Sequence, residues 1–216
     1  MDVTPGLRDR KKARTRQRIA DVAAELFASH GYDDVTMLDV ARAAEVSDQT
    51  VYNYFAAKQE LVLDRAEQFR DLYRRAVAGR GPGTSPAAAL LPLVTADVER
   101  YRTGDVDVAR GEFIAQSVES EVLRRFTLEE RERQALVVAE AISATTPGLP
   151  PIIARAHAAA LVAVVQALYD QIGSGILDRS DQERTADAIL ATLDVAFSSL
   201  DRSFDDLVAH ATTSSD

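Results

Sequence analysis

Seven of the eight residues from 47 to 54 have side chains that donate or accept hydrogen bonds. Side chains of these types match the donor and acceptor groups that base edges present in the major groove of a duplex. Val51, the exception, precedes Phe55 by four residues, so the two share one inward face of a short helix. The segment therefore predicts a helix that exposes polar groups, namely Ser47, Asp48, Gln49, Thr50, Tyr52, Asn53 and Tyr54.

Catalysis has much weaker support from residue types and spacing. The histidines His30, His157 and His210 form no His-x-x-x-His or Glu-x-x-His pair, and the chain has no cysteine. Metal chemistry is therefore not indicated. The Gly-x-Ser-x-Gly, Gly-x-Gly-x-x-Gly and P-loop motifs are also missing from the sequence. We expect a protein that is not an enzyme and that uses no metal or cofactor.

A second short helix is predicted immediately before the polar one. Thr36 followed by Asp39 is typical of an N-cap with an acidic residue three positions on, and Ser47 suits the N-cap of the next helix. Two short helices joined by a tight turn make a helix-turn-helix, whose second helix enters a major groove. An ordinary helical hairpin is the alternative. Capping, length and polar exposure together favour the DNA-binding interpretation.

A basic segment precedes this pair of helices. Residues 8–18 contain one acid, Asp9, against the basic residues Arg8, Arg10, Lys11, Lys12, Arg14, Arg16 and Arg18. Such an arm would follow DNA phosphates, and a solvated disordered tail is the alternative. Apolar residues at helical spacing then predict a first helix that completes a three-helix module and ends near Gly31; they are Ile19, Val22, Ala23, Leu26 and Phe27.

Composition limits the class of protein. The chain has 216 residues and a net charge of −9. The acidic residues are unevenly distributed: residues 1–80 are close to neutral, whereas residues 81–216 carry the excess of negative charge. The missing cysteines suit a reducing cytoplasm, and no signal peptide is visible. The uncharged, apolar stretch 156–169 is shorter than a bilayer-spanning helix. We expect a cytoplasmic protein with no membrane partner.

The second part of the chain is also predicted to be helical, which makes the fold class all-α. One helix is expected from Ala57 to Ala78, and glycine and proline in 79–86 place a domain boundary near residue 80. The expected domains are 1–80, with the arm, helix-turn-helix and connecting helix, and 81–216, for effector binding and dimerisation. Five further helices are predicted at 86–103, 105–118, 121–145, 150–172 and 182–201.

The last two of these helices have the apolar seams that helix packing requires. Pairing them with their copies in a second subunit would make a four-helix dimer interface, and the two-fold axis would place two recognition helices on two half-sites. Packing inside a monomer is the alternative. The residues predicted for the interface are Leu161, Val165, Leu168, Leu190, Leu193, Phe197 and Leu200.

Residues 14–62 resemble the DNA-binding domain of the TetR family of one-component transcriptional regulators. The resemblance depends on Arg18-Ile19, Ala24-Glu25-Leu26-Phe27, Gly31-Tyr32, Val35-Thr36, Asp39-Val40-Ala41, Ala44-Glu45-Val46-Ser47, Val51-Tyr52-Asn53-Tyr54-Phe55 and Lys58. It implies phosphate contacts from Thr36, Tyr52 and Lys58, and base or backbone contacts from residues 47–50, Asn53 and Tyr54. With Arg14 and Arg16 of the basic arm, these residues are the predicted DNA-binding site. A solvated Lys58 is the alternative for that residue.

Three positions depart from the family pattern. Glu45 stands where glycine is common, so the turn must hold a side chain in a conformation that glycine adopts more easily. Ala57 replaces a frequent capping serine, which weakens the next helix by about 1 kcal/mol. Asp48 stands where a basic or small residue is usual. An acid there complements the helix dipole and can accept from a cytosine amino group, although phosphates repel it.

The resemblance also implies a regulator that small molecules control. The leading hypothesis is a homodimeric repressor that a small, mostly apolar effector releases from a palindromic operator. A ligand-independent DNA-binding module, an activator and, least supported, an enzyme are the alternatives. For each candidate effector-binding residue taken singly, a place in the core is the favoured alternative. The candidates are Phe69, Tyr73, Val98, Tyr101, Phe113, Gln116, Ser120, His157, Gln166 and Tyr169.

Overall fold

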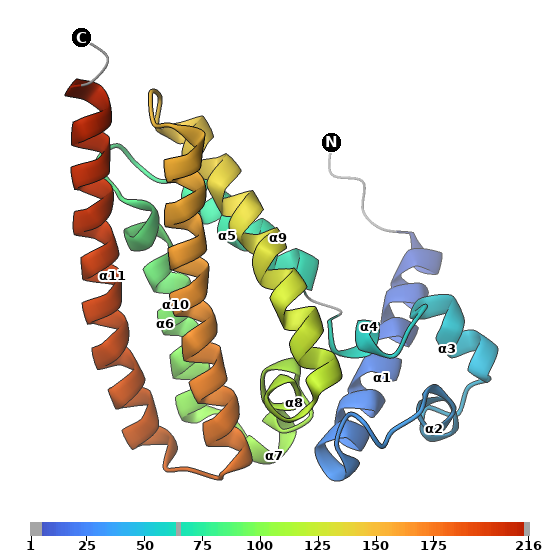
Figure 1. The fold of residues 1–216 in the computed structure, drawn as a ribbon. Helices are drawn as coiled ribbons and strands as arrows, with labels where there is room; N and C mark the ends of the chain where they lie inside the picture. Colours follow the sequence, from blue (N-terminus) through green and yellow to red (C-terminus); the bar gives the residue numbers. More distant parts are fainter. Residues whose placement is uncertain (1–5, 64–65, 214–216) are drawn as a thin grey trace.

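The computed structural model describes residues 6–63 and 66–213, and this part of the chain contains helices but no strand. The all-α fold class is therefore confirmed. Figure 1 shows α1–α4 grouped at one side of the molecule and the long helices α9–α11 at the other. The helices are α1 (Leu7–His30), α2 (Met37–Ala43), α3 (Asp48–Tyr54), α4 (Gln59–Val62), α5 (Ala66–Ala78), α6 (Pro86–Thr103), α7 (Val106–Ala109), α8 (Phe113–Glu119), α9 (Glu121–Thr145), α10 (Pro151–Leu177) and α11 (Gln182–Thr213).

The first three helices form the predicted three-helix module. The Thr36 hydroxyl accepts from the backbone N–H of Asp39, whose carboxylate accepts from the Thr36 N–H, so α2 begins with a complete capping box. Ser47 caps α3 by accepting from the Thr50 N–H. These caps satisfy N–H groups that a helix start leaves without partners. Val51 and Phe55 are fully buried in the core of this module, as the spacing predicted.

The basic segment differs from the prediction of an arm that precedes the first helix. The helix α1 begins at Leu7, so the basic residues form its first three turns. The expected connecting helix also differs: α4 ends at Val62 and α5 begins at Ala66. Leu61 is buried in the core of the first module, and both Leu61 and Leu63 line a cavity against the second part.

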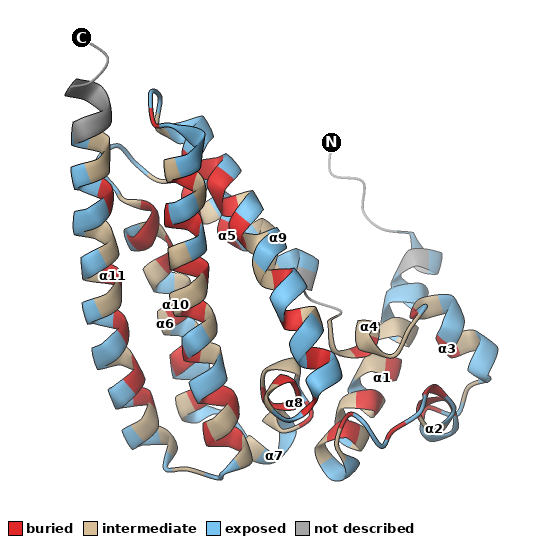
Figure 2. Cartoon of the chain, viewed as in Figure 1, coloured by how far each residue is buried: buried red, intermediate tan, exposed pale blue. Residues whose placement is uncertain are grey.

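The second part is a bundle around one core. The helices α5, α6, α9, α10 and α11 contribute its buried side chains (Figure 2). The predicted bounds of α6 and α9 are confirmed, whereas the helix expected at 105–118 is divided into α7 and α8. Tyr73 and Val77 of α5 pack in this core. The division of the chain at residue 80 stays a prediction, and by its packing α5 belongs with the bundle.

The helix predicted at 150–172 extends five residues further than expected. The helix α10 continues through Gly173 and Gly175 to Leu177. A Cβ at Gly173 would lie 2.5 Å from the carbonyl oxygen of Ile114, and one at Gly175 would lie 2.5 Å from the Tyr101 hydroxyl oxygen. These glycines therefore allow close approach of α8 and α6 rather than helix termination. The helix α11 likewise continues past the expected end at residue 201.

The apolar faces of α10 and α11 pack inside the subunit, which corrects the predicted dimer interface. Five of its residues are buried in the bundle core: Leu161, Val165, Leu168, Leu193 and Phe197. Leu190 and Leu200 are partly buried against the same core. An apolar period identifies which face of a helix is buried, but not whether the same subunit or a second one covers it. In the described part of the chain, α10 alone is long and apolar enough to span a bilayer.

His157 of α10 gives the subunit a pH-dependent stability. Its ring lies 4.7 Å from the Phe204 ring, between centroids, and its Nε2 has no partner among the described residues. Burial lowers the pKa of His157 to about 4, against a nearby Asp201 that raises it. The unfolded chain therefore binds a proton that the folded chain excludes between about pH 6.5 and pH 4, so stability falls as the pH decreases through this window.

We expect His157 to account for a loss of about 3 kcal/mol in the free energy of unfolding between pH 7 and pH 4. Urea titrations of the wild type and of His157→Leu at both pH values measure this contribution. The carboxylates titrate in both proteins, so the difference between the two losses isolates the imidazole. Equal losses in the two proteins would show that burial of the neutral ring does not contribute.

Candidate nucleic-acid interface and interdomain cavity

The polar face of α3 is exposed, as Figure 2 shows. Asp48, Gln49 and Asn53 are exposed, and the Tyr52 side chain is 50% exposed. The Gln49 amide donates to the Asn53 side chain at 3.2 Å, and one Asp48 oxygen accepts from the Gln49 N–H at 2.8 Å. A seven-residue helix with this many accessible donors and acceptors suits direct contact with base edges.

The turn between α2 and α3 places Glu45 in a backbone conformation that glycine adopts more easily than a residue with a side chain. Glu45 has φ of 52°, in the left-handed region where glycine is at ease and a side chain is strained. The N–H of Val46 donates to the carbonyl of Ala41 at 3.0 Å and closes the turn. The buried Val40 and Val51 hold the two helices on either side of it. Their packing offsets the local strain of Glu45.

Two predicted phosphate-binding cations have partners within the protein. The Arg16 guanidinium donates to the Tyr54 carbonyl and lies 4.2 Å from the Phe55 ring centroid, so it ties α1 to the end of α3. The Lys58 ammonium donates to the Asp33 carbonyl at 3.2 Å and lies 4.1 Å from the Tyr32 ring centroid. Burial lowers the pKa of Lys58. Arg14 is exposed on α1. DNA contacts from all three stay predictions.

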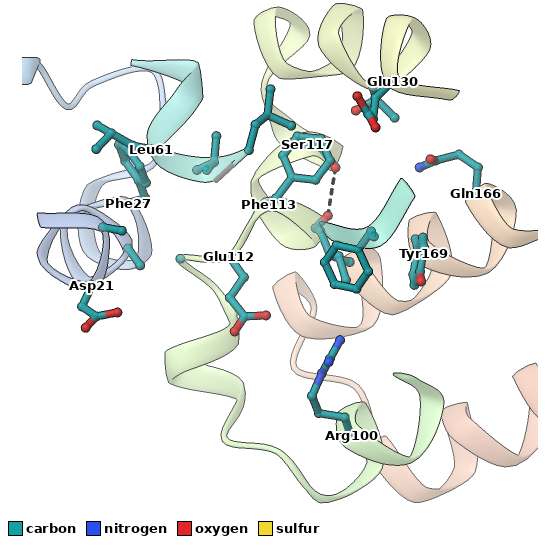
Figure 3. Close-up of a pocket in the computed structure, with 18 of the residues that line it drawn as sticks. Asp21, Phe27, Leu61, Arg100, Glu112, Phe113, Ser117, Glu130, Gln166 and Tyr169 are labelled. Atoms are coloured by element: carbon teal, nitrogen blue, oxygen red, sulfur yellow. Dashed lines mark hydrogen bonds between the residues drawn. The ribbon is translucent and has the colours of Figure 1, made fainter. Parts of the chain in front are cut away.

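A cavity of about 280 Å³ lies between the three-helix module and the bundle (Figure 3). One wall is formed by α1 and by residues 61–63, and the others by α5, α6, α8, α9 and α10. The wall from α1 was not predicted from the sequence, because the residues involved, apart from Phe27, lie beside its buried stripe. The α1 residues at the cavity are Gln17, Ala20, Asp21, Ala24 and Phe27.

The structure brings half of the predicted effector residues together at this cavity, namely Phe69, Tyr73, Phe113, Gln166 and Tyr169. The other five lie elsewhere. Val98 is buried in the bundle core, Tyr101 lines a smaller cavity of about 180 Å³, and His157 packs against Phe204. Gln116 and Ser120 are buried in contacts between the two parts of the chain. Residue type and helix order could not separate these environments.

A chain of hydrogen bonds runs from the cavity into the bundle. The hydroxyl oxygens of Tyr73 and Tyr169 are 2.9 Å apart, and the Tyr169 hydroxyl donates to Asp97 Oδ2 at 2.5 Å. Burial raises the pKa of Tyr73 to about 12 and raises that of Tyr169 as well. Both phenols are therefore protonated at neutral pH. Arg100 pairs with the same carboxylate, at 3.0 Å from Asp97 Oδ1.

The two parts of the chain meet at a close contact beside the cavity. A Cβ at Gly111 would overlap the carbonyl oxygen of Ala24 on α1. The buried Gln116 side chain accepts from the Tyr32 N–H at 2.7 Å and donates to the Phe27 carbonyl at 3.2 Å. The Ser120 hydroxyl donates to Asp33 at 2.8 Å. The segment from α7 to the start of α9 is thus docked on the end of α1 and the loop that follows it.

A helix-turn-helix module is docked on a larger helical bundle, with a cavity between the two parts. Comparison with known proteins identifies the first of these parts. Residues 19–64 match the profile of the bacterial regulatory proteins, tetR family. This range contains the whole helix-turn-helix, so the DNA-binding module of the chain matches that of the TetR family.

A curated relative and two solved structures are similar to the chain. The HTH-type transcriptional regulator TcmR of Streptomyces glaucescens is 34% identical over 107 residues, which cover 50% of this chain and 47% of TcmR. The structure of NalD, the secondary repressor of the MexAB-OprM multidrug efflux pump in Pseudomonas aeruginosa, aligns with a TM-score of 0.58 at 21% identity. That alignment covers 85% of this chain and 97% of NalD.

The structure of FadR from Bacillus subtilis in complex with stearoyl-CoA aligns with a TM-score of 0.53 at 18% identity, covering 82% of this chain and 96% of FadR. The two structural likenesses establish the fold. The chain spans about half the length of TcmR in that match.

Proposed function

We propose that the chain is a homodimeric transcriptional repressor that leaves a palindromic operator when a small, mostly apolar effector occupies the interdomain cavity. The observation that carries this proposal is the composition of the cavity wall. A ligand there touches α1 of the DNA-binding module and five helices of the bundle at once. Its binding energy therefore depends on how the two parts are placed relative to each other.

The coupling follows from this dependence. A dimer bound to an operator must hold its recognition helices about 34–36 Å apart, one turn of the duplex. An effector that favours a different placement of α1 against the bundle shifts the population away from that spacing. A differential affinity of about 1–3 kcal/mol would change operator affinity by about 5- to 150-fold. The same reciprocity requires that operator DNA weaken binding of the effector.

We propose that the dimer forms through the outward faces of α10 and α11, not the faces that the sequence favoured. Each outward face carries a stripe of uncharged, mostly small side chains, which allow close helix approach, and on α11 the exposed Asp187 and Asp194 lie beside this stripe. On α10 and α11 they comprise Ala156, Ala159, Ala163 and Ala167, and Ala188, Ala191, Thr192 and Val195. Val195 is 69% exposed in the subunit, and Ile152, near the start of α10, is 76% exposed. A four-helix interface would cover both.

The proposed site on DNA is the polar face of α3 with the start of α2 and the basic turns of α1. It comprises Thr36, Ser47, Asp48, Gln49, Thr50, Tyr52, Asn53, Tyr54 and Lys58, with Arg14 and Arg16. The relatives are bacterial transcriptional regulators, which supports a regulatory rather than enzymatic role and a cytoplasmic location. Activation of transcription would use the same surface with the opposite outcome.

Selection of bound fragments from random and genomic DNA tests the proposal. We expect recovery of a palindrome with half-sites one helical turn apart, bound by two subunits. Compounds that raise the melting temperature of the free protein are then added to the complex, and at least one is expected to release the DNA. Recovery of no common sequence would contradict the proposal of sequence-specific DNA binding. If the stabilising compounds leave the complex with DNA intact, only the proposal of control by an effector is contradicted.

We predict that Asp48→Ala changes sequence preference more than general affinity for DNA. The carboxylate is exposed at the start of α3, where it can accept from a cytosine amino group. Its removal should relax the choice at one base pair per half-site, worth about 1–3 kcal/mol, without losing phosphate contacts. Selections with both proteins measure the preference, and Glu45→Ala, in the turn before α3, is the control. An unchanged preference would remove Asp48 from the contact surface.

A further inference from the structure

The hydrogen-bond chain at the cavity has a fixed direction. Asp97, held by Arg100 at 3.0 Å, is a carboxylate and can only accept, so the single proton of the Tyr169 hydroxyl points to it. The oxygen of Tyr169 must then accept from Tyr73 across the 2.9 Å contact. Tyr73 has no other proton to give. Its oxygen therefore offers only acceptor lone pairs to a ligand.

The aliphatic hydroxyls of the cavity wall also donate their protons to groups within the protein. The Ser117 hydroxyl donates to the Ile114 carbonyl at 3.1 Å, and the Thr127 hydroxyl donates to the Leu123 carbonyl at 3.1 Å. Each hydroxyl uses its one proton on its own helix and keeps acceptor lone pairs. The hydroxyl groups that line the cavity are thus all acceptors towards a ligand.

The charged side chains of the wall also leave mainly acceptors for a ligand, because the carboxylates outnumber the cations once the ion pairs are set aside. Arg70 neutralises Glu130, at 2.5 Å, and Asp97 neutralises Arg100. Asp21 accepts only from the neutral amide of Gln17 at 2.7 Å. The carboxylate of Glu112 is exposed and has no hydrogen-bond or ion-pair partner among the described residues. Figure 3 shows Glu112 and Arg100 extending towards the same region. The charges that remain unpaired at the cavity are negative.

We propose that the effector is a small hydrophobic amine whose protonated nitrogen meets the acceptors of Tyr73 and Glu112. This inference rests on the proposed function for the existence of an effector site. The apolar remainder of the wall suits an aromatic or aliphatic body; it is formed by Phe27, Leu61, Val62, Leu63, Phe69, Phe113 and Ile114. An ammonium group donates up to three hydrogen bonds and accepts none, which matches this set of acceptors.

Three probes of nearly equal shape separate the chemical classes: 4-phenylbutylamine, 4-phenylbutan-1-ol and 4-phenylbutanoate. Calorimetric titration of the full chain at pH 7, without DNA, measures their affinities. We expect the amine to bind about tenfold more tightly than the carboxylate, with the alcohol between them. Glu112→Gln should weaken binding of the amine alone by about three- to tenfold. Glu119→Gln, an exposed glutamate at the end of α8, should leave all three affinities unchanged.

The direction of the hydrogen-bond chain has its own test. Tyr169→Phe removes the acceptor that holds the Tyr73 proton, while Asp97 and Arg100 keep their ion pair. Tyr73 can then donate to a ligand, so the ratio of amine to carboxylate affinity should fall by about tenfold. A merely structural loss would weaken all three probes equally and leave the ratio unchanged.

Three results would overturn the proposal: tighter binding of the carboxylate, which would make Arg100 the dominant anchor; an unchanged ratio in Tyr169→Phe; and no binding of any probe. Because these titrations contain no DNA, they are independent of the operator experiment. Failure to find an operator would contradict the repressor and leave the probe preferences intact. A preference for the carboxylate would contradict the amine and leave the repressor intact.

Discussion

Val195→Glu is expected to leave a folded subunit that no longer dimerises and that binds the operator at least about 100-fold more weakly. Val195 is 69% exposed on the outward face of α11, so a carboxylate there costs the isolated subunit little. In the proposed dimer the same position is covered by a second subunit, and two unpaired carboxylates would be buried near the two-fold axis. Burial of unpaired charge opposes association strongly.

The loss of operator affinity follows from loss of the second half-site. A dimer places two α3 helices on one operator, so the second contact occurs at a high effective concentration. Sedimentation gives the oligomeric state, and titration of labelled operator gives the affinity. Val122→Glu, the same change at a position 49% exposed on α9, is the matched control. A dimeric Val195→Glu with unchanged affinity would place the interface on another surface.

The local structure of the DNA-binding module could be predicted from sequence because its signals are local. Thr36 and Ser47 are bonded to N–H groups only three residues away. Val51 and Phe55 share a face through helix geometry alone. The bounds of α6 follow from Ser85, which caps its start, and from the glycine after its end. Each of these features needs no knowledge of what lies across the core.

The cavity and the interface could not be predicted because they depend on which elements meet. Gly173 directly follows the predicted end of its helix, yet the helix continues through it, and the missing side chain allows the Ile114 carbonyl to approach closely. Phe197 was assigned to a second subunit, yet its own bundle covers it. Gln116 looked like a ligand contact, yet it holds the end of α1. Residue type and apolar periodicity predict which face of a helix is buried. Contacts between residues far apart in the sequence determine which element covers that face.

Gly111→Ala is expected to separate effector binding from DNA release. The new Cβ would overlap the Ala24 carbonyl oxygen, and a backbone atom in a packed helix cannot move aside as a flexible side chain does. The segment between α7 and α8 must therefore withdraw from α1, at a cost of about 1–3 kcal/mol in stability. The cavity wall from α1 would then no longer move with the wall from α8.

Titration of operator complexes with a releasing compound measures this separation. The wild type should lose DNA affinity by about 5- to 150-fold on saturation, whereas Gly111→Ala should lose less than about threefold. Gly81→Ala is the matched control, because its Cβ would meet only the Thr84 hydroxyl at 3.8 Å. The free energy of unfolding shows whether the variant remains folded at the assay temperature. A stable Gly111→Ala that releases DNA like the wild type would show that coupling does not pass through this contact, and would leave residues 61–63 as the route from the cavity to α3.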